Sequence, residues 1–354
     1  MLNFILSLEH LALIKIAVDI YNDPEIRAFE NDSYSITAMP MEKLEPLVKK
    51  KMPDLDIFPR VQKRIIGLMR PISYEIITWL QDHHDILEIK TLEPAIKFSW
   101  KSNGTIDRMK TAKNFMRSEH FSILLRFRMA CVYWSEEDAR RLWNEMHPSE
   151  RRYHCDSYIC DHKPVWDTIM IEWTSYLESE SEDWTQFPFH RPLSFYCREG
   201  AALQGNIFHH LSPRERMHVF KEVMAESPVY KKRFCLSQMT AKEREEIIAK
   251  EPFQILRTFL NWPLQLKFLE MAESIMMQLT KQHFYCLLHE IISEKIKIQW
   301  NDFDYVYLLQ WLWERSPYHF KQYVAQKEFF KFLMKALNHD YSVPFLEECP
   351  CYKQ

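Results

Sequence analysis

Glycine is scarce in this chain: Gly67, Gly104, Gly200 and Gly205 are the only four among 354 residues. At the average glycine content of about 7%, a chain of this length would contain roughly 25 glycine residues. Hairpin turns, barrel corners and phosphate-binding loops need positive φ or a close approach of the backbone, which glycine usually supplies. The scarcity therefore argues against all three features. Hydrophobic residues make up 47% and charged residues 27%, as expected of helices with one buried and one solvated face.

Long apolar runs are absent as well, and no stretch reaches the roughly 18–20 uncharged apolar residues of a membrane span. The apolar N-terminal segment is interrupted by Glu9 and Lys15, lacks a preceding basic region and a following cleavage site, and is interpreted as a core helix. Without a secretory signal, the eight cysteines indicate reduced thiols. Cys131 and Cys286 lie in apolar helical patterns and are predicted to be small core residues. We expect a soluble, cytoplasmic chain, with the nucleus not excluded and no membrane partner.

The charge balance gives no broad case for a nucleic-acid partner, because the net charge is −3 and both signs are mixed along the chain. Two short basic runs, Lys49–Lys51 and Lys231–Arg233, are interpreted as solvated helix faces or ends, which is the usual role of such triplets. The sequence thus predicts no nucleic-acid partner.

Helix start signals recur from end to end. Ser135, Ser212 and Thr240 each precede an acidic first turn, and the last two have the capping-box spacing to a glutamate three residues on. Apolar residues at helical spacing follow such signals, as in Phe268–Ile275 and Phe284–Ile291. The pattern predicts an all-α fold: an array of short antiparallel helices, α-solenoid-like, without a significant β-sheet.

One stretch departs from this pattern. Ile96, Phe98 and Trp100 alternate with polar residues before Asn103-Gly104, a dipeptide that favours a tight hairpin. The residues after Gly104 do not alternate, so a helix ending at Gly104 is preferred. Glycine would then supply the left-handed residue, and Thr105 would cap the next helix.

The best internal boundary is the acidic segment Glu178–Asp183, which lacks large apolar residues and is followed by two prolines. We therefore predict an N-terminal helical array over residues 1–177, an acidic linker or loop over 178–191, a C-terminal helical array over 192–340 and a frayed tail over 341–354.

Two neighbouring stretches, GTIDRMKTAKNF and FRMACVYWSEEDARRLW, carry a resemblance to a known family. The chain resembles a lineage-expanded group of uncharacterised helical proteins predicted from spider genomes, whose members often carry cysteine where this chain has Trp134. The resemblance is best in the N-terminal part of the chain and implies an α-helical, repeat-like array with no known activity. Besides the G-T-I-D element and an SLEHLALIKIAV-like first helix, the shared elements stand here as Arg126-Phe127, Ala130-Cys131, Tyr133, Glu137-Asp138 and Leu142-Trp143.

A cluster of four potential metal ligands lies between Arg151 and Trp166: His154, Cys155, Cys160 and His162. These side chains carry the nitrogen and sulfur atoms that zinc prefers. The spacing of these four residues differs from that of common closed zinc sites. Side chains adjacent in sequence do not easily point toward the same ion, and nine residues leave little chain to surround the ion with four ligands. A polar loop pinned by aromatic residues is therefore preferred, and the zinc site is kept as a hypothesis.

No other motif is complete. Gly200 and Gly205 have phosphate-loop spacing, but the lysine and the serine or threonine that should follow are missing, so close packing of small residues is the better interpretation. We expect a non-enzymatic intracellular scaffold that acts through contacts with an unknown protein partner and needs no cofactor. The alternative is a metal- or cysteine-dependent enzyme, or a zinc-stabilised module, that uses the His154, Cys155, Cys160 and His162 cluster.

Overall fold

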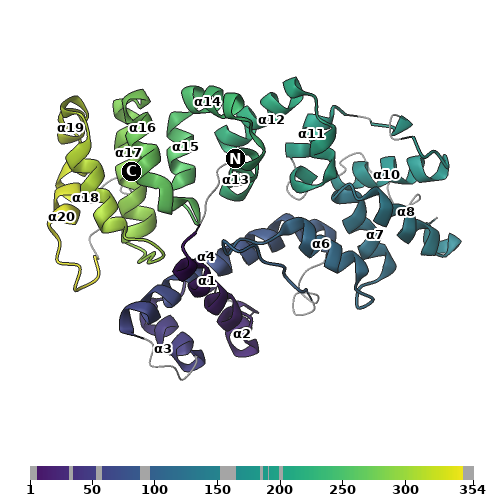
Figure 1. The fold of residues 1–354 in the computed structure, drawn as a ribbon, viewed down its shortest axis with the longest axis horizontal. Helices are drawn as coiled ribbons and strands as arrows, with labels where there is room; N and C mark the ends of the chain where they lie inside the picture. Colours follow the sequence, from purple (N-terminus) through teal and green to yellow (C-terminus); the bar gives the residue numbers. More distant parts are fainter. Residues whose placement is uncertain are drawn as a thin grey trace. The chain divides into compact units, whose positions relative to one another are not determined.

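The computed structural model of the chain is built from helices (Figure 1). It describes residues 6–31, 35–52, 58–87, 96–151, 165–183, 186–189, 191–198 and 202–345. Over these ranges there are α-helices, short 3₁₀ turns and one π-helical turn, with no strand beyond an isolated antiparallel bridge between Trp100 and Ile106. The prediction of an all-α fold is confirmed. None of the helices described here is both long and apolar enough to cross a membrane.

The chain divides into two compact units. The first unit comprises Ile76–Lys101 and Ile106–Met239, and the second comprises Leu2–Glu75, Ser102–Thr105 and Thr240–Gln354. The division falls within one long helix, α4 (Pro59–Asp82), and again at the start of α14. The predicted linker or loop, residues 178–191, lies inside the first unit.

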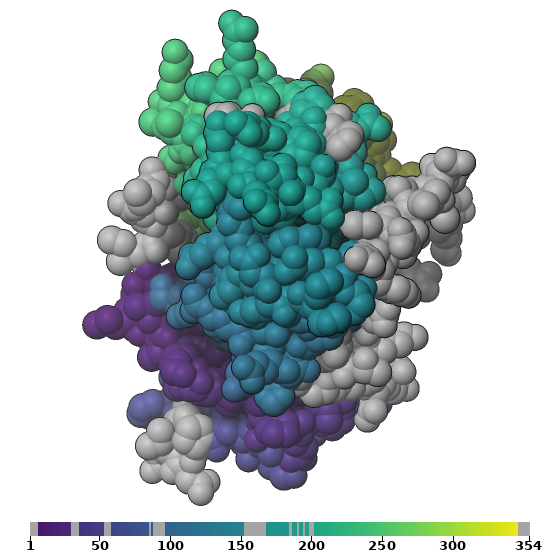
Figure 2. Space-filling view, turned by 90° about the vertical axis from the view of Figure 1, so that its right-hand side faces the viewer, coloured from purple at the N-terminus to yellow at the C-terminus, as the bar shows by residue number. Residues whose placement is uncertain are grey.

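In the first unit, helices that follow one another in the chain pack as pairs: α6 on α7, α7 on α8, α11 on α12 and α12 on α13. Helix α10 also packs on α7. Figure 2 shows the blue-to-teal residues of this unit as a closely packed surface. Besides the end of α4, its elements are α5 (His84–Leu87), α6 (Arg108–Arg117), α7 (Ile123–Val132), α8 (Glu136–Glu145), α10 (Val165–Glu178), α11 (Leu193–Arg198), η4 (Ala202–Gln204), η5 (Asn206–His210), α12 (Pro213–Glu226) and α13 (Val229–Gln238).

In the second unit, the helices from α15 to α20 stand side by side (Figure 1). Helix α17 packs on α15, α18, α19 and α20, so a core forms along its apolar face. Besides the start of α4, the elements are α1 (Leu8–Tyr21), α2 (Pro24–Asn31), α3 (Met41–Lys51), α14 (Ala241–Lys250), α15 (Pro252–Phe259), η6 (Leu264–Lys267), α16 (Phe268–Ile275), η7 (Met276–Gln278), α17 (Lys281–Ile291), the π-helical turn η8 (Ile292–Ile296), α18 (Tyr305–Arg315), α19 (Tyr318–Ala325) and α20 (Phe329–Asn338).

The predicted start signals coincide with helix N-termini. Ser212 and Thr240 both form complete capping boxes, in which the hydroxyl accepts from the N3 amide and the N3 glutamate accepts from the cap amide. Ser135 also occupies the N-cap position, but its hydroxyl donates to the Asp138 carboxylate at 2.9 Å instead of accepting from the backbone. Local sequence therefore fixes where these helices begin.

The predicted helix ending at Gly104 is wrong, although Gly104 is left-handed as expected, with φ of 75°. Residues 96–99 are not helical, and the alternating aromatic residues before the turn leave Trp100 bridged to Ile106. The amide oxygen of Asn103 accepts from the Thr105 amide at 3.2 Å, which closes the turn. Asp107, not Thr105, caps α6 by accepting from the Lys110 amide at 3.0 Å.

The acidic segment after α10 is a loop anchored within the first unit. The Arg140 guanidinium of α8 donates to the Ser181 carbonyl at 2.5 Å. Further on, the rings of Phe187 and Phe189 pack on Trp134, with centroids 5.2 and 5.5 Å away. Aromatic packing of this kind holds the loop against the core.

One of the two basic runs is not solvated. Lys231 and Lys232 of α13 are only 9% and 7% exposed, so the prediction of a solvated face is wrong for this run. Lysine can bury its aliphatic stem along apolar surface, which a charge count does not reveal. The run at Lys49–Lys51 does end α3 near the surface, where the Lys50 ammonium pairs with Glu25 at 2.9 Å.

Candidate ligand-binding site

The predicted metal cluster, His154, Cys155, Cys160 and His162, falls outside the residues that the structure describes. The zinc hypothesis therefore stays a prediction. Elsewhere, in the part of the chain that is described, no group of three or more histidine, cysteine, aspartate or glutamate side chains is arranged to hold a metal ion.

Gly205, the second glycine of the phosphate-loop spacing, has a packing role. A Cβ atom at this position would lie 2.6 Å from the carbonyl oxygen of Tyr133, well inside contact distance. That same carbonyl accepts a hydrogen bond from the Asn206 amide at 3.0 Å. The interpretation that a small residue allows close packing is confirmed at Gly205, where the 3₁₀ turns meet the end of α7.

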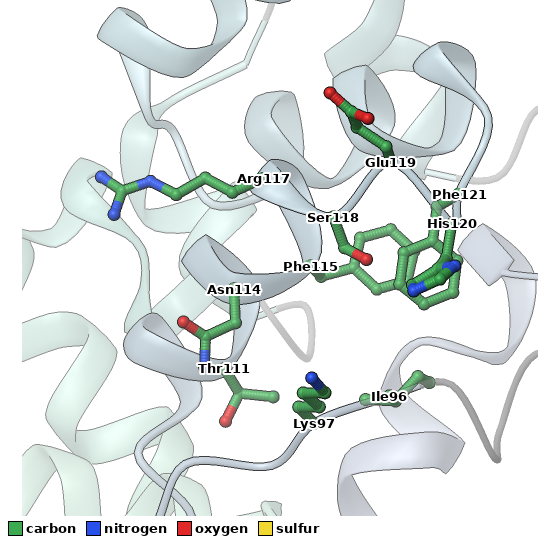
Figure 3. Close-up of a pocket in the computed structure, with 10 residues that line it drawn as sticks. All are labelled: Ile96, Lys97, Thr111, Asn114, Phe115, Arg117, Ser118, Glu119, His120 and Phe121. Carbon is green, nitrogen blue, oxygen red and sulfur yellow. The ribbon is translucent and has the colours of Figure 1, made fainter.

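A cavity of about 570 Å³ opens in the first unit between the extended residues Ile96 and Lys97 and the C-terminal half of α6 (Figure 3). The turn after α6, residues 118–121, closes its other side. Its volume lies within the range of about 300–1,000 Å³ that is usual for ligand sites. We call this cavity the α6 pocket.

An apolar floor forms on one side of the α6 pocket. The rings of Phe115 and Phe121 stack with centroids 3.8 Å apart and an interplanar angle of 15°. Both rings are 3% exposed, and Ile96 beside them is 2% exposed. Figure 3 shows the two rings at one end of the pocket, near Ile96. The turn after α6 places Phe121 back over Phe115, so the two rings cover each other and expose little apolar surface to the pocket.

Two hydrogen bonds hold the walls of the α6 pocket together. The Thr111 hydroxyl accepts from the Ser99 amide at 3.0 Å, and the Asn114 side-chain amide donates to the Ser99 hydroxyl at 3.0 Å. Both residues lie on the face of α6 that borders the pocket. These bonds fix the extended segment against α6 and so keep the opening in place.

Two cations, Lys97 and Arg117, line the α6 pocket. Lys110 and Lys113 are not among its lining residues, but with Arg117 they recur at i, i+3 and i+7 and so lie along one side of α6. We call these four residues the α6 basic patch. All four are exposed, and none forms an ion pair with any residue that the structure describes. Glu119 is the acidic residue in the lining, and Figure 3 shows it extending in a different direction from Arg117.

A buried polar cluster in the first unit holds α4, α6 and α13 together. The Arg108 guanidinium donates to the Asp82 carboxylate at 2.5 Å and lies 3.7 Å from the centre of the Tyr230 ring. The Tyr230 hydroxyl donates to the other Asp82 oxygen at 2.5 Å. Beside them, burial and the nearby Arg108 charge lower the pKa of His83 to about 3. His83 is therefore neutral near pH 7, and the cluster is satisfied internally, as expected of a structural core.

A second polar cluster, in the second unit, is incompletely paired. The Lys295 ammonium donates to the Asn261 amide oxygen at 2.9 Å, and the Gln265 amide donates to Oδ2 of Asp302 at 2.9 Å. Oδ1 of Asp302 and Oε1 of Gln265 are buried without a hydrogen-bond partner among the described residues. Burial raises the pKa of Asp302 to about 6, against the attraction of Lys295.

The backbone around this second cluster is unusual. Lys295 lies in the π-helical turn η8, and Gln299 has a φ of 56°, which non-glycine residues rarely adopt. The Arg70 guanidinium of α4 holds this segment by donating to the carbonyls of Ile298 and Gln299 at 2.5 and 2.6 Å. Strained backbone and shifted pKa values do gather at functional sites, but none of these residues lines the α6 pocket.

Sequence reasoning missed the α6 pocket. The available signal was the local charge of the sequence. Residues 96–128 contain eight lysine or arginine residues and two acidic residues, so this segment has a net charge of +6, whereas the whole chain has a net charge of −3. The helical spacing of Lys110, Lys113 and Arg117 was also visible in the sequence. That these cations have no ion-pair partner, and that Phe115 and Phe121 form a floor, follows only from the fold.

Comparison with protein-family models, with curated proteins and with solved structures gives no match to this chain. The geometry of the α6 pocket and the two cations in its lining are therefore the basis for assigning a function.

Proposed function

We propose that this chain is a non-enzymatic, α-solenoid-like scaffold that acts inside the cell through contacts with a protein partner. The observation that carries this proposal is the α6 pocket, an open cavity of about 570 Å³ with two exposed cations, Lys97 and Arg117, in its lining. Neither cation has an ion-pair partner among the described residues. A cavity of this size with a few polar or charged groups at its edge is typical of a recognition site.

The packing of the second unit supports the scaffold part of the proposal. Helix α15 packs on α14 and α16, and α17 packs on α15 and α18, so each helix rests mainly on elements close to it in the chain. Nearest-neighbour packing is how helical arrays present extended surfaces. The resemblance to helical, repeat-like proteins agrees with such an array and adds no activity.

Affinity capture with the full chain tests the proposed function. We expect one or a few proteins from a native tissue extract to be retained saturably, and the purified partner to bind again with a measurable Kd. An unrelated helical protein of similar size and net charge serves as the bait control. If nothing is retained above that control across repeated extracts, the scaffold proposal is wrong.

The zinc module remains the second candidate, because four ligand-capable side chains lie within nine residues. Under the scaffold proposal, elemental analysis of the purified chain will show zinc well below one equivalent, and C155S/C160S will leave the melting temperature unchanged. A stoichiometric zinc content that the double variant abolishes, together with a lower melting temperature, would establish the alternative instead.

A further inference from the structure

We propose that Asp302 and Gln265 of the second unit share one proton as a neutral acid–amide pair, and that this pair is a pH-sensitive latch. In the closed latch, the protonated Oδ1 of Asp302 donates to Oε1 of Gln265. Loss of the proton turns this contact into a repulsion between two buried acceptors and loosens residues 297–304 from α4. The latch is a property of the second unit and does not depend on the proposed function.

Two acceptors without donors are the first argument for the shared proton. The Gln265 amide donates to Oδ2 of Asp302 at 2.9 Å, so one hydrogen bond already joins the two planar groups. Their other oxygens, Oδ1 of Asp302 and Oε1 of Gln265, are buried and have no hydrogen-bond partner among the described residues. An ionised carboxylate and an amide oxygen can only accept, whereas a protonated carboxyl also donates. One proton on Oδ1 therefore satisfies both atoms.

Burial makes the missing donor costly. Gln265 is 0% exposed, and although Asp302 as a residue is half-buried, its Oδ1 atom is not accessible to solvent. A buried acceptor without a donor destabilises a fold, and a buried charge does so more strongly. Protonation of Asp302 removes both costs. The pKa of this carboxyl, which burial raises to about 6, agrees with a proton that is held more tightly than usual.

Two titratable groups oppose the neutral form without removing it. Lys295 of η8 attracts the ionised form of Asp302 and lowers its pKa, but the two form no ion pair in the part of the chain that is described. The Lys295 ammonium instead donates to Asn261 at 2.9 Å and lies 5.1 Å from the centre of the Trp300 ring. The Tyr305 hydroxyl of α18 also lowers the pKa of Asp302, and burial outweighs both effects.

Charged groups on the other neighbouring elements are engaged elsewhere. Arg70 of α4 donates to backbone carbonyls, and Glu290 of α17 pairs with Arg257 of α15 at 2.6 Å. Glu294 of η8 is exposed, and Lys267 of η6 pairs with an acidic side chain of α16. The charge of Asp302 is therefore the one whose loss leaves Oδ1 and Oε1 satisfied.

The residues before Asp302 rest on α4 through close contacts. Gly67 permits the approach, because a Cβ atom at this position would lie 2.3 Å from the carbonyl oxygen of Asn301. One turn further along α4, the Arg70 guanidinium donates to the carbonyls of Ile298 and Gln299. Asp302 follows Asn301 directly, so a carboxylate repelled by Gln265 displaces the residues that lie against α4.

The backbone here depends on such contacts. The turn η8 is π-helical, and Gln299 is left-handed with a φ of 56°. Both conformations are uncommon and persist where the surrounding structure holds them. Weakening the contact between Asp302 and Gln265 therefore releases this backbone and does not leave it in place.

Infrared spectroscopy of the full chain tests for the proton. A protonated carboxyl has a carbonyl band that an ionised carboxylate lacks, and the difference between the original chain and D302N isolates the band of Asp302. At pH 5 ordinary aspartates are ionised. We expect Asp302 to show the acid band at pH 5 and to lose it with a midpoint near pH 6. The matched control is D19N, at a side chain that is 57% exposed, and its difference spectrum should contain no acid band at pH 5.

Hydrogen–deuterium exchange tests the latch itself. After correction for the intrinsic pH dependence of exchange, we expect opening of residues 297–304 to increase about 10-fold between pH 5 and pH 7.5. This is the change linked to one proton whose pKa is about 6 in the closed form and 3.8 in the open form. In D302N the amide can form the same two hydrogen bonds at every pH, so its exchange should not change. D19N should behave like the original chain.

The inference is overturned if Asp302 shows no acid band at pH 5, as expected of an ionised carboxylate bridged to Gln265 by internal water. It is also overturned if residues 297–304 of the original chain open equally at both pH values, a comparison that does not require D302N to fold. A folded D302N with the same pH dependence as the original chain would overturn it too.

Discussion

Replacing Asp82 by alanine is expected to destabilise the chain by about 3–5 kcal/mol, because the change leaves a buried charge without its partner. Arg108 is 4% exposed and ion-pairs with Asp82, whose own side chain is 14% exposed. The Tyr230 hydroxyl loses its acceptor in the same variant. Water cannot easily reach the guanidinium to compensate, so the desolvation cost of Arg108 remains while its Coulomb partner is gone.

Urea unfolding followed by circular dichroism measures this loss, and a double-mutant cycle assigns it. In D82A/R108M no buried charge remains, so we expect most of the lost stability to return. D82N keeps an acceptor for Tyr230 and should cost less, about 1–3 kcal/mol. A D82A chain as stable as the original, or a double variant less stable than D82A, would show that the pair does not hold α4 and α6 together.

The second large effect concerns pH and Asp302. Burial raises the pKa of this carboxyl to about 6, from the usual 3.8. The folded chain therefore holds this proton more tightly than the unfolded chain. The contribution of Asp302 to stability is thus greatest below pH 3.8 and falls as the pH rises through 6. A pKa shift of this size corresponds to a change of about 3 kcal/mol in the free energy of unfolding between the two ends of that pH range.

D302N should remove this pH dependence, because asparagine is neutral throughout the range. Its carbonyl can accept from the Gln265 amide, and its amino group supplies a donor in place of the unpartnered Oδ1 of Asp302. Lys295 loses an attractive charge but keeps its bond to Asn261. We therefore expect D302N to exceed the original chain in stability by up to about 3 kcal/mol near pH 7.5 and to equal it near pH 3.5.

The urea midpoints of the original chain and of D302N, measured side by side over that pH range, give the difference in their stability as a function of pH. Titrating groups that do not interact with Asp302 contribute equally to both chains and cancel. If the difference is constant with pH, or if D302N is the less stable chain near pH 7.5, the shifted pKa of Asp302 does not govern the second cluster.

The sequence predicted features that depend on local chemistry. Ser212 and Thr240 begin helices because a hydroxyl and a glutamate three residues apart satisfy backbone amides within one turn. Features set by tertiary contacts were not predictable in this way. Arg70 contacts the carbonyls of Ile298 and Gln299, which lie more than two hundred residues away in the sequence. No local sequence pattern predicts that contact.

The errors have physical causes of the same kind. The sequence around Gly104 was compatible with a helix end and with a tight turn. In the structure it forms a turn, after which Ile106 bridges back to Trp100, a contact that the residues before the turn do not predict alone. Lys231 and Lys232 are buried although lysine is usually exposed. Cys131 is fully buried as predicted, whereas Cys286 is only half-buried.

Hydrogen–deuterium exchange of the full chain, with and without the protein recovered by affinity capture, tests the central claim most directly. If the α6 pocket is the contact site, amides around Lys97 and in residues 108–121 will exchange more slowly with the partner present. Protection confined to other parts of the chain would contradict the assignment of this pocket as the contact site.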